Sequence, residues 1–158
     1  MSRATEWVLL SYRLPRTPST PRISVWRRLN RLGVAQLADG LVALPADART
    51  REALEWVAEE VRDNAGEATV WLGHPVDADA HKAIVSRMTE ALTKEYEAVL
   101  LEATSQRVTD AAARRRVLAR LRRTLNRIDS RDFFSPPARD QALRAVEELA
   151  EQNSLTRL

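Results

Sequence analysis

The stretch WVLLSYRLPRTPSTPRISVWRRLNRLGVAQLADGLVALP, at residues 7–45, decides the fold class, because its apolar runs are separated by a segment with helical periodicity. Residues 7–14 are rich in leucine, valine and aromatic side chains and are followed at once by Pro15, which predicts a strand that ends there. Three prolines then stand between residues 15 and 21. The segment therefore begins with a strand and continues into a stiff loop.

A helix is expected after this loop. Ser19 or Thr20, followed by Pro21, is typical of a helix start with proline at the first helical position. The helix is predicted to run to about Leu32 and to stop at Gly33. Its apolar side chains recur on one face, opposite three arginines, and we expect that face to be buried; it consists of Val25, Trp26, Leu29 and Leu32.

A hairpin is predicted at residues 34–45, where Asp39-Gly40 lies between two short apolar runs. Both central residues of such a tight turn are expected to have positive φ. Asp47 is the expected cap of a second helix, from Ala48 to Ala65, with Gly66 ending it. The apolar stripe that predicts this helix consists of Leu54, Val57, Ala58, Val61 and Ala65.

A fourth strand is expected at residues 67–73, EATVWLG. The resulting order β-α-β-β-α-β is the ferredoxin-like split motif, an antiparallel sheet with two helices on one face, so the fold class is predicted as α+β. After residue 75 the pattern is helical. We expect a C-terminal extension of about three α-helices, the first starting near Asp77 or Asp79, the second capped by Thr109 and the third starting at Ser135-Pro136.

The predicted domain organisation is a core at 1–75 and a helical extension at 76–158, packed together as one compact unit. The open face of the sheet, where Trp7, Leu9 and Trp71 are expected to point, is the apolar surface that the extension would cover. The alternative is a dimer formed through that face or through the long helices.

Composition excludes several classes of protein. The chain has 158 residues, 44% of them hydrophobic, and no cysteine, which leaves no thiol nucleophile, disulfide or Cys-ligated metal. No apolar run approaches the ~18 residues of a spanning helix. We therefore expect a cytoplasmic protein without a membrane partner. No nucleophile with a base and an orienting group, no phosphate-binding Gly-rich loop and no dinucleotide fingerprint is visible, so neither an enzyme nor a cofactor is expected.

Charge is distributed unevenly along the chain. The net charge is only +3, and the 25 basic residues include just two lysines. Residues 1–34 carry seven arginines against one glutamate, residues 35–105 are strongly acidic, and residues 106–131 carry nine arginines against two aspartates. Two basic blocks that flank an acidic middle indicate an anionic partner, or two halves that pack through complementary charge.

The first candidate site is an oxyanion site in the proline-rich loop. A helix N-terminus offers unpaired N–H groups and a positive dipole end. Hydroxyl donors and arginines around it suit a sulfate-like or phosphate-like anion. The residues expected to bind it are Arg13, Arg16, Ser19, Thr20 and Arg22. The alternative is an ordinary capped helix start with solvent-exposed arginines.

The second candidate is a nucleic-acid interface. On the predicted helix that carries the second basic block, arginines fan over the surface outside the apolar stripe, and only Arg114 falls within it. Such a face neutralises phosphates with little sequence information. Salt bridging with the acidic helix at 48–65 or within a dimer is the alternative. The residues predicted to contact nucleic acid are Arg27, Arg28, Arg31, Arg115, Arg116, Arg120, Arg122, Arg123 and Arg127.

Three further features have structural interpretations. His74, Asp77, Asp79 and His81 are chemically able to bind a divalent metal, but aspartates are also typical of a helix start, and no metal is predicted. Phe133-Phe134 is expected to plug the core at a helix junction. Trp56 lies off the apolar stripe of its helix, and Tyr12 and Tyr96 occupy ordinary amphipathic positions.

The chain resembles the N-terminal domain of the ChrB-type chromate resistance proteins over nearly its whole length. The segments that carry the resemblance lie at 7–34, 37–45, 52–61, 68–73 and 128–134, and the most specific pieces are LPRTPSTPR and RDFF. The core also resembles the small domain of CRISPR adaptation nucleases, but Ser11 and Arg13 stand where those place a metal-binding aspartate, so nuclease chemistry is not expected.

The resemblance implies a chromate-responsive regulator, so the predicted function is an oxyanion-responsive, DNA-binding transcriptional regulator or accessory of chromate resistance. Its expected partners are DNA, chromate or a sulfate-like oxyanion, and a second copy or another protein. Many family members continue into a second domain, so the alternative is a non-enzymatic interaction module that works with a separate partner domain. A third interpretation, an oxyanion reductase, requires an electron carrier for which no binding residues are evident.

Overall fold

The computed structural model describes residues 6–107 and 110–155. The chain forms two compact units, Met1–Arg87 and Met88–Leu158. The boundary between the units lies inside the helix that follows the last strand. The sequence pattern placed this boundary earlier, after residue 75. The expected packing of the helical extension on the sheet stays a prediction.

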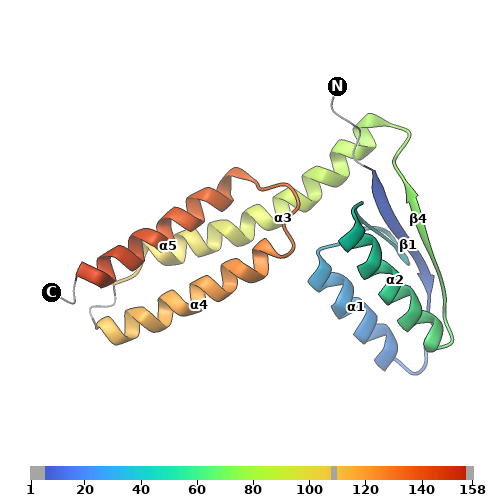
Figure 1. The fold of residues 1–158 in the computed structure, drawn as a ribbon, viewed down its shortest axis with the longest axis horizontal. Helices are drawn as coiled ribbons and strands as arrows, with labels where there is room; N and C mark the ends of the chain where they lie inside the picture. Colours follow the sequence, from blue (N-terminus) through green and yellow to red (C-terminus); the bar gives the residue numbers. More distant parts are fainter. Residues whose placement is uncertain (1–5, 108–109, 156–158) are drawn as a thin grey trace. The chain divides into compact units, whose positions relative to one another are not determined.

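The first unit is an antiparallel sheet with two helices on one of its faces (Figure 1). The strands are hydrogen-bonded in the order β2-β3-β1-β4, and each neighbouring pair is antiparallel. The α+β class predicted from the sequence is thereby confirmed. The elements are β1 (Trp7–Arg13), α1 (Thr20–Leu32), β2 (Ala35–Ala38), β3 (Leu41–Pro45), α2 (Ala48–Asp63) and β4 (Glu67–Gly73).

Alternation along β1 separates the two faces of the sheet. Val8 and Leu10 are fully buried and point to the helices. Leu9 points to the opposite face, where its cross-strand neighbours are Ala43 and Trp71. The helices bury the stripes that their periodicity predicted, which comprise Val25 and Leu29 of α1 and Leu54, Val57, Ala58 and Val61 of α2.

Two residues that were predicted to be buried, one tryptophan and one alanine, are exposed. Trp26, expected on the buried face of α1, is 58% exposed, because it lies at the edge of the stripe formed by Val25 and Leu29. The helix α2 ends at Asp63, and Ala65 is exposed with a φ of 62°. Ala65 therefore takes the left-handed turn after the helix, and it is not part of the buried stripe.

The hairpin β2–β3 turns at Asp39-Gly40 as expected, but by another geometry. Gly40 has a φ of 72°, whereas Asp39 is not among the positive-φ residues of the described chain. The pairing also shifts register between Gln36 and Ala38. A bulge therefore supplies part of the twist that two positive-φ residues would otherwise provide.

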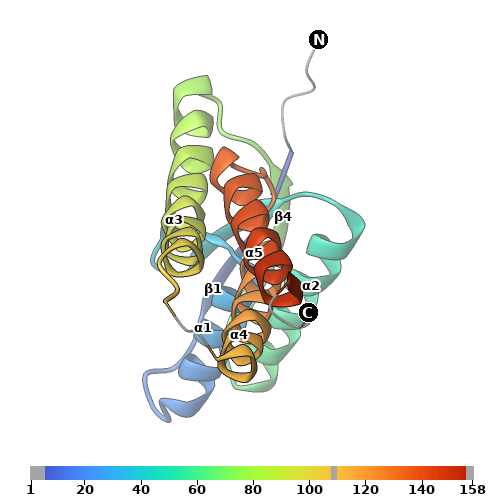
Figure 2. The same ribbon diagram turned by 90° about the vertical axis from the view of Figure 1, so that its left-hand side faces the viewer.

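The second unit is a bundle of three helices, α3 (Ala78–Thr104), α4 (Ala111–Asp129) and α5 (Pro137–Leu155), and α3 also extends into the first unit. They lie side by side in both views (Figures 1 and 2). The bundle has its own hydrophobic core, to which all three helices contribute and which includes Leu92, Tyr96, Leu118, Leu121, Leu125, Ile128, Val146 and Leu149.

The cap of α4 differs from the prediction. Thr109 lies outside the described residues, and the N-cap is Asp110, whose carboxylate accepts hydrogen bonds from the N–H groups of Ala112 and Ala113 at 3.2 Å each. Within residues 6–107 and 110–155, no helix combines the length and the apolar character needed to cross a membrane. The two lysines of the chain, Lys82 and Lys94, are exposed on α3.

Candidate functional site

A hollow of about 760 Å³ lies where β1 ends, α1 begins and the β2–β3 turn folds back, and we call it the basic pocket. Of the residues predicted to bind an oxyanion, Arg13, Ser19 and Arg22 line this pocket. Arg16 and Thr20 are exposed and are not among its lining residues. The structure thus brings together three of the predicted residues and separates two.

The basic pocket depends on a close approach between the turn and the end of β1. The N–H of Tyr12 donates to the carbonyl of Gly40 at 2.8 Å. A Cβ on Gly40 would lie 2.4 Å from the carbonyl oxygen of Tyr12, so only glycine permits this contact. The contact brings Asp39 and Gln36 to the wall of the pocket.

The start of α1 gives this pocket positive potential. Ser19 is the N-cap residue, but its side chain makes no capping hydrogen bond, and no acidic residue lies in the first turn. The positive end of the helix dipole therefore has no carboxylate in its own first turn to neutralise it, and it lies beside the guanidinium groups of Arg13 and Arg22. This arrangement suits an anion better than a cation.

Seven of the lining residues were not predicted as site residues, and three of these, Tyr12, Trp26 and Asp39, bear on the binding of an anion. The pKa of Tyr12 is raised, chiefly by burial, while Arg22 lowers it and Asp39 raises it, so the phenol stays protonated at neutral pH and can donate a hydrogen bond. Trp26 forms part of the wall, and its position one helical turn after Arg22 is the signal that could have placed it there. The carboxylate of Asp39 also lies in the wall and disfavours an anion, so the two guanidinium groups and the helix N-terminus must outweigh it.

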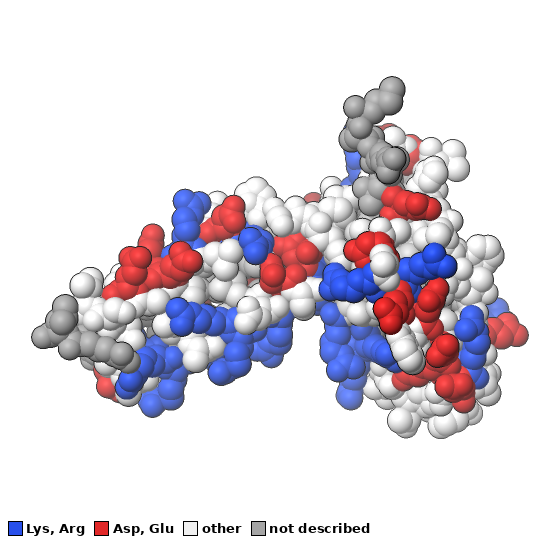
Figure 3. Space-filling view, viewed as in Figure 1, with Lys and Arg blue, Asp and Glu red and all other residues white. Residues whose placement is uncertain are grey.

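A second basic surface follows α4, and we call it the α4 arginine face. Its members are exposed, and no ion pair joins them to any carboxylate in the described ranges. Figure 3 shows Lys and Arg side chains gathered along this helix. The α4 arginine face consists of Arg115, Arg116, Arg122, Arg123 and Arg127.

Arg120 was predicted to belong to this face but is engaged within the bundle. It donates to both carboxylate oxygens of Glu102 on α3, and this hydrogen bonding lowers the pKa of Glu102. Salt bridging, the alternative interpretation of the arginines, therefore describes Arg120. Arg114, which the periodicity placed in the apolar stripe, is half-buried.

On α1, the three arginines predicted to contact nucleic acid also divide into two kinds. Arg28 donates to Glu60 of α2 at 3.0 Å, and the hydroxyl of Ser24 donates to the other oxygen of the same carboxylate at 2.8 Å. Arg27 and Arg31 are exposed, and in the part of the chain that the structure describes neither forms an ion pair. The acidic helix thus neutralises one of the three.

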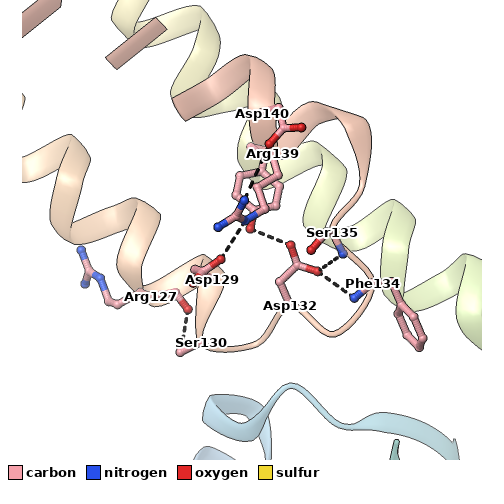
Figure 4. Close-up of polar contacts among 9 residues, drawn as sticks. Arg127, Asp129, Ser130, Asp132, Phe134, Ser135, Arg139 and Asp140 are labelled. Carbon is pink, nitrogen blue, oxygen red and sulfur yellow. Dashed lines mark hydrogen bonds and ion pairs between the residues drawn. The ribbon is translucent and has the colours of Figure 1, made fainter. Parts of the chain in front are cut away.

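The corner between α4 and α5 holds the arginine-bearing helix in place (Figure 4). The buried Tyr96 donates its hydroxyl proton to Asp132 at 2.8 Å. Asp132 also accepts from the N–H groups of Phe134 and Ser135, at 3.0 and 2.8 Å. Burial, followed by the hydrogen bond to Asp132, raises the pKa of Tyr96 well above its ordinary value.

Two ion pairs flank this corner. Arg131 donates to both oxygens of Glu95 on α3, at 2.9 Å each, and Arg139 of α5 donates to Asp129 at 2.9 Å. The sequence predicted Phe133-Phe134 as a core plug, but both side chains are only half-buried. The polar contacts of Asp132 and Arg131, which the pattern did not reveal, are what join the three helices here.

The histidine and aspartate segment after β4 has a structural role at His81. The indole N–H of Trp7 donates to Nδ1 of His81 at 3.0 Å, and the two rings meet edge to face. Among the described residues, no group of three or more His, Asp or Glu side chains could hold a metal ion.

Comparison with known proteins gives two matches. The family model described as "Protein ChrB, N-terminal" matches residues 22–155. Protein ChrB of Cupriavidus metallidurans is 32% identical over 145 residues, which cover 89% of this chain and 44% of that protein. The chain therefore spans less than half the length of this curated relative.

Proposed function

The chain belongs to the family of ChrB N-terminal domains, and from this premise we propose that it is a chromate-resistance regulator that binds DNA and responds to an oxyanion. We assign DNA backbone binding to the α4 arginine face, with Arg27 and Arg31 of α1 as a second basic surface. We assign the oxyanion to the basic pocket. The proposal is non-enzymatic and places the protein in the cytoplasm, where its DNA target lies.

The observation that carries the DNA proposal is the α4 arginine face. Arg115, Arg116, Arg122, Arg123 and Arg127 are exposed, and no described carboxylate neutralises them. A structural role would pair these side chains as it pairs Arg120, Arg131 and Arg139. A row of unneutralised guanidinium groups on one helix matches the repeated charge of a phosphate backbone.

The oxyanion proposal is supported by the convergence of Arg13, Ser19 and Arg22 on one pocket. A tetrahedral dianion can accept hydrogen bonds from two guanidinium groups, a hydroxyl and a helix N-terminus at the same time. The protonated Tyr12 adds a further donor in the same wall. Chromate and sulfate share this geometry, so both are expected to bind.

We further propose the ferredoxin-like assignment for the first unit and a dimer as the working form. The strand order β2-β3-β1-β4 with all pairs antiparallel, and both helices on one face, supports the fold assignment. A dimer would present two α4 arginine faces, which would raise affinity for a duplex by avidity.

The DNA assignment is tested by a salt titration of binding to a mixed-sequence duplex. Each lost phosphate contact lowers the slope of log K against log salt by about 1, so Arg123→Ala with Arg127→Ala is expected to reduce the slope by about 2. Arg144→Ala on α5 is the matched control, because it removes an exposed arginine outside the α4 arginine face. A double variant with an unchanged slope, or a chain that does not bind the duplex, refutes the assignment.

The oxyanion assignment is tested by calorimetry with sulfate and with chromate. Arg22→Ala removes a charge-assisted hydrogen bond and is expected to weaken binding about tenfold or more. Arg16→Ala is the matched control, since Arg16 belongs to the same loop but does not line the basic pocket. Equal losses in the two variants would indicate general electrostatic attraction and would remove the pocket from the assignment.

A second candidate function is a protein-interaction module that acts with a separate domain. On this proposal the counterpart of that domain is the part of the Cupriavidus protein that this chain does not match. On this proposal the chain alone does not bind the duplex, and binding appears when the remaining part of the Cupriavidus protein is added in trans.

A further inference from the structure

The face of the sheet opposite α1 and α2 carries a second hollow, of about 510 Å³, which we call the open-face pocket. Its walls come from all four strands, from the chain after β4 and from the first turns of α3, and include Trp7, Leu9, Leu41, Trp71, Pro75 and Ile84. Among the residues that the structure describes, no Asp, Glu, Lys or Arg lines it. The volume falls within the range of about 300–1,000 Å³ that is typical of small-molecule sites.

The two indole rings of the open-face pocket are held in place by hydrogen bonds from their own N–H groups. Trp7 donates to Nδ1 of His81 at 3.0 Å, and Trp71 donates to the hydroxyl oxygen of Ser11 at 2.9 Å. Trp7 is 1% exposed, whereas Trp71 is 54% exposed and directly opposite Leu9 on the neighbouring strand. The pocket thus has a buried aromatic end wall and an accessible aromatic side wall, both oriented before any ligand arrives.

The chemistry of the walls defines the ligand. Because both indole N–H groups are already bonded, the rings offer only apolar surface and π faces. Ser11 accepts from Trp71 and keeps its own hydroxyl proton, which can be donated to a ligand acceptor. The imidazole of His74 lies in the wall as the other polar group. An uncharged planar aromatic molecule with one or two hydrogen-bond acceptors fits this set.

The shape of the pocket favours a small molecule over a protein surface. The chain that links β4 to α3, at His74 and Pro75, and Ile84 of α3 are both part of the wall, so the sheet face is concave at this end. The flat sheet face of a second copy would span the hollow without filling it. Fixed aromatic walls also lower the entropic cost of binding a small rigid ligand.

We propose that the open-face pocket is a binding site for a small, uncharged, planar aromatic molecule, which stacks on Trp71, packs against Trp7 and accepts a hydrogen bond from Ser11. This site is separate from the basic pocket and from the α4 arginine face, and it stands whether or not those bind anions.

The proposal is tested on the full chain with 7-diethylamino-4-methylcoumarin, a neutral planar aromatic probe whose lactone carbonyl accepts hydrogen bonds and which the arginine surfaces do not attract by charge. The probe is expected to bind saturably at one site per chain, with a blue-shifted emission and with energy transfer from tryptophan. Trp71→Ala removes the side wall and is expected to weaken binding about tenfold. Trp56→Ala is the matched control, because Trp56 is 55% exposed on α2 and does not line the pocket.

A second variant blocks the pocket without removing a wall. A Cβ added at Gly73 meets no atom within 4 Å, and Gly73 lines the pocket opposite Trp7 on the neighbouring strand. Gly73→Leu is therefore expected to fold normally by circular dichroism and to weaken probe binding by about tenfold or more, because its side chain takes the ligand's volume.

Three results overturn the proposal: no saturable binding to the wild-type chain, unchanged affinity in both Trp71→Ala and Gly73→Leu, or an equal loss in Trp56→Ala. A fourth is a wild-type dimer that Gly73→Leu converts to a monomer in sedimentation, since this assigns the face to a second copy. The salt dependence of DNA binding is measured on Gly73→Leu as well and is expected to be unchanged.

Discussion

Tyr96 is fully buried in the bundle core, and its hydroxyl donates a hydrogen bond to the carboxylate of Asp132 at 2.8 Å. The same carboxylate accepts two backbone N–H groups, so it satisfies donors from α3 and from the loop that starts α5. A buried polar group with a charged partner contributes more to stability than an exposed one, and loss of the Tyr96 hydroxyl leaves Oδ2 of Asp132 without this donor, since the two backbone N–H groups bond to Oδ1. Tyr96 is therefore a structural residue of the second unit.

Tyr96→Phe is expected to lower the free energy of unfolding by about 1.5 kcal/mol, since it removes one hydrogen bond to a charged group and leaves the packing volume intact. Urea unfolding followed by circular dichroism measures this change. Tyr12→Phe serves as the control, because the hydroxyl of Tyr12 makes no hydrogen bond to another residue within the part of the chain that the structure describes. Equal effects of the two substitutions would contradict the role given to Tyr96.

The raised pKa of Tyr96 predicts a loss of stability in alkali. Above the ordinary tyrosine pKa of 10.0 the unfolded chain releases the phenol proton, while the folded chain retains it. The unfolded state then binds fewer protons than the folded state, so the free energy of unfolding falls as pH rises. Measured between about pH 9 and 11, the decline is expected to be steeper in the wild type than in Tyr96→Phe. Parallel curves would contradict this.

At the residue level, local chemistry predicted part of the candidate site. Arg13, Ser19 and Arg22 could be found because a helix start and nearby arginines are visible in the sequence. Arg16 does not line the basic pocket, and the sequence could not show this, since the path of an exposed loop does not follow from composition. Asp132 is 36 residues from Tyr96, and no local periodicity reveals a bond across that separation.

The ends of the helices show which signals act locally. Gly33 ends α1 with a φ of 81°, and Asp47 caps α2 through a reciprocal pair with Thr50, both as the sequence indicated. Trp26 and Ala65 were assigned wrongly to buried faces, because periodicity gives the direction of a side chain but not the extent of the neighbouring element. Local signals therefore predict where a helix begins and ends better than they predict which residues at the margins of its apolar stripe are buried.

Asp47→Ala is expected to destabilise the chain by about 1 kcal/mol, because it removes the cap from the N–H of Thr50 at 2.7 Å. Asp47→Ser restores a capping oxygen and is expected to recover most of the loss. Asp63→Ala, at the other end of α2, is the control, since a carboxylate there opposes the helix dipole. Thermal unfolding distinguishes these outcomes, and a loss in Asp63→Ala as large as that in Asp47→Ala would contradict the capping role.

The cap also predicts a dependence on acid pH. The backbone N–H of Thr50 is the main cause that lowers the pKa of Asp47 below its ordinary value of 3.8. A lowered pKa in the folded state gives stability that is present above the ordinary value and lost as pH falls through the folded one. The stability difference between wild type and Asp47→Ala is therefore expected to shrink below about pH 4. A difference that is constant down to about pH 2 would count against this account.

The whole molecule comprises two units with separate buried cores. The core of the second unit takes its residues from α3, α4 and α5 alone. All four tryptophans of the chain, at 7, 26, 56 and 71, belong to the first unit. Tryptophan fluorescence therefore monitors the sheet unit, whereas circular dichroism at 222 nm monitors helices in both.

Leu121→Ala tests whether the units unfold independently. Leu121 is fully buried in the second unit, so its truncation is expected to cost about 3 kcal/mol. The circular dichroism transition is expected to shift to lower urea concentration, while the tryptophan fluorescence transition stays in place. A common shift of both signals would show that the two units unfold as one cooperative system.

The scarcity of lysine has a practical consequence for labelling chemistry. Lys82 lies in the first unit and Lys94 in the second, both exposed on α3, and no cysteine competes for electrophiles. Amine-reactive dyes on side chains therefore mark one point in each unit while leaving every arginine of the basic pocket and of the α4 arginine face unmodified. The two lysines supply a donor and acceptor pair for energy-transfer measurements across the boundary of the units, with both of these basic surfaces intact.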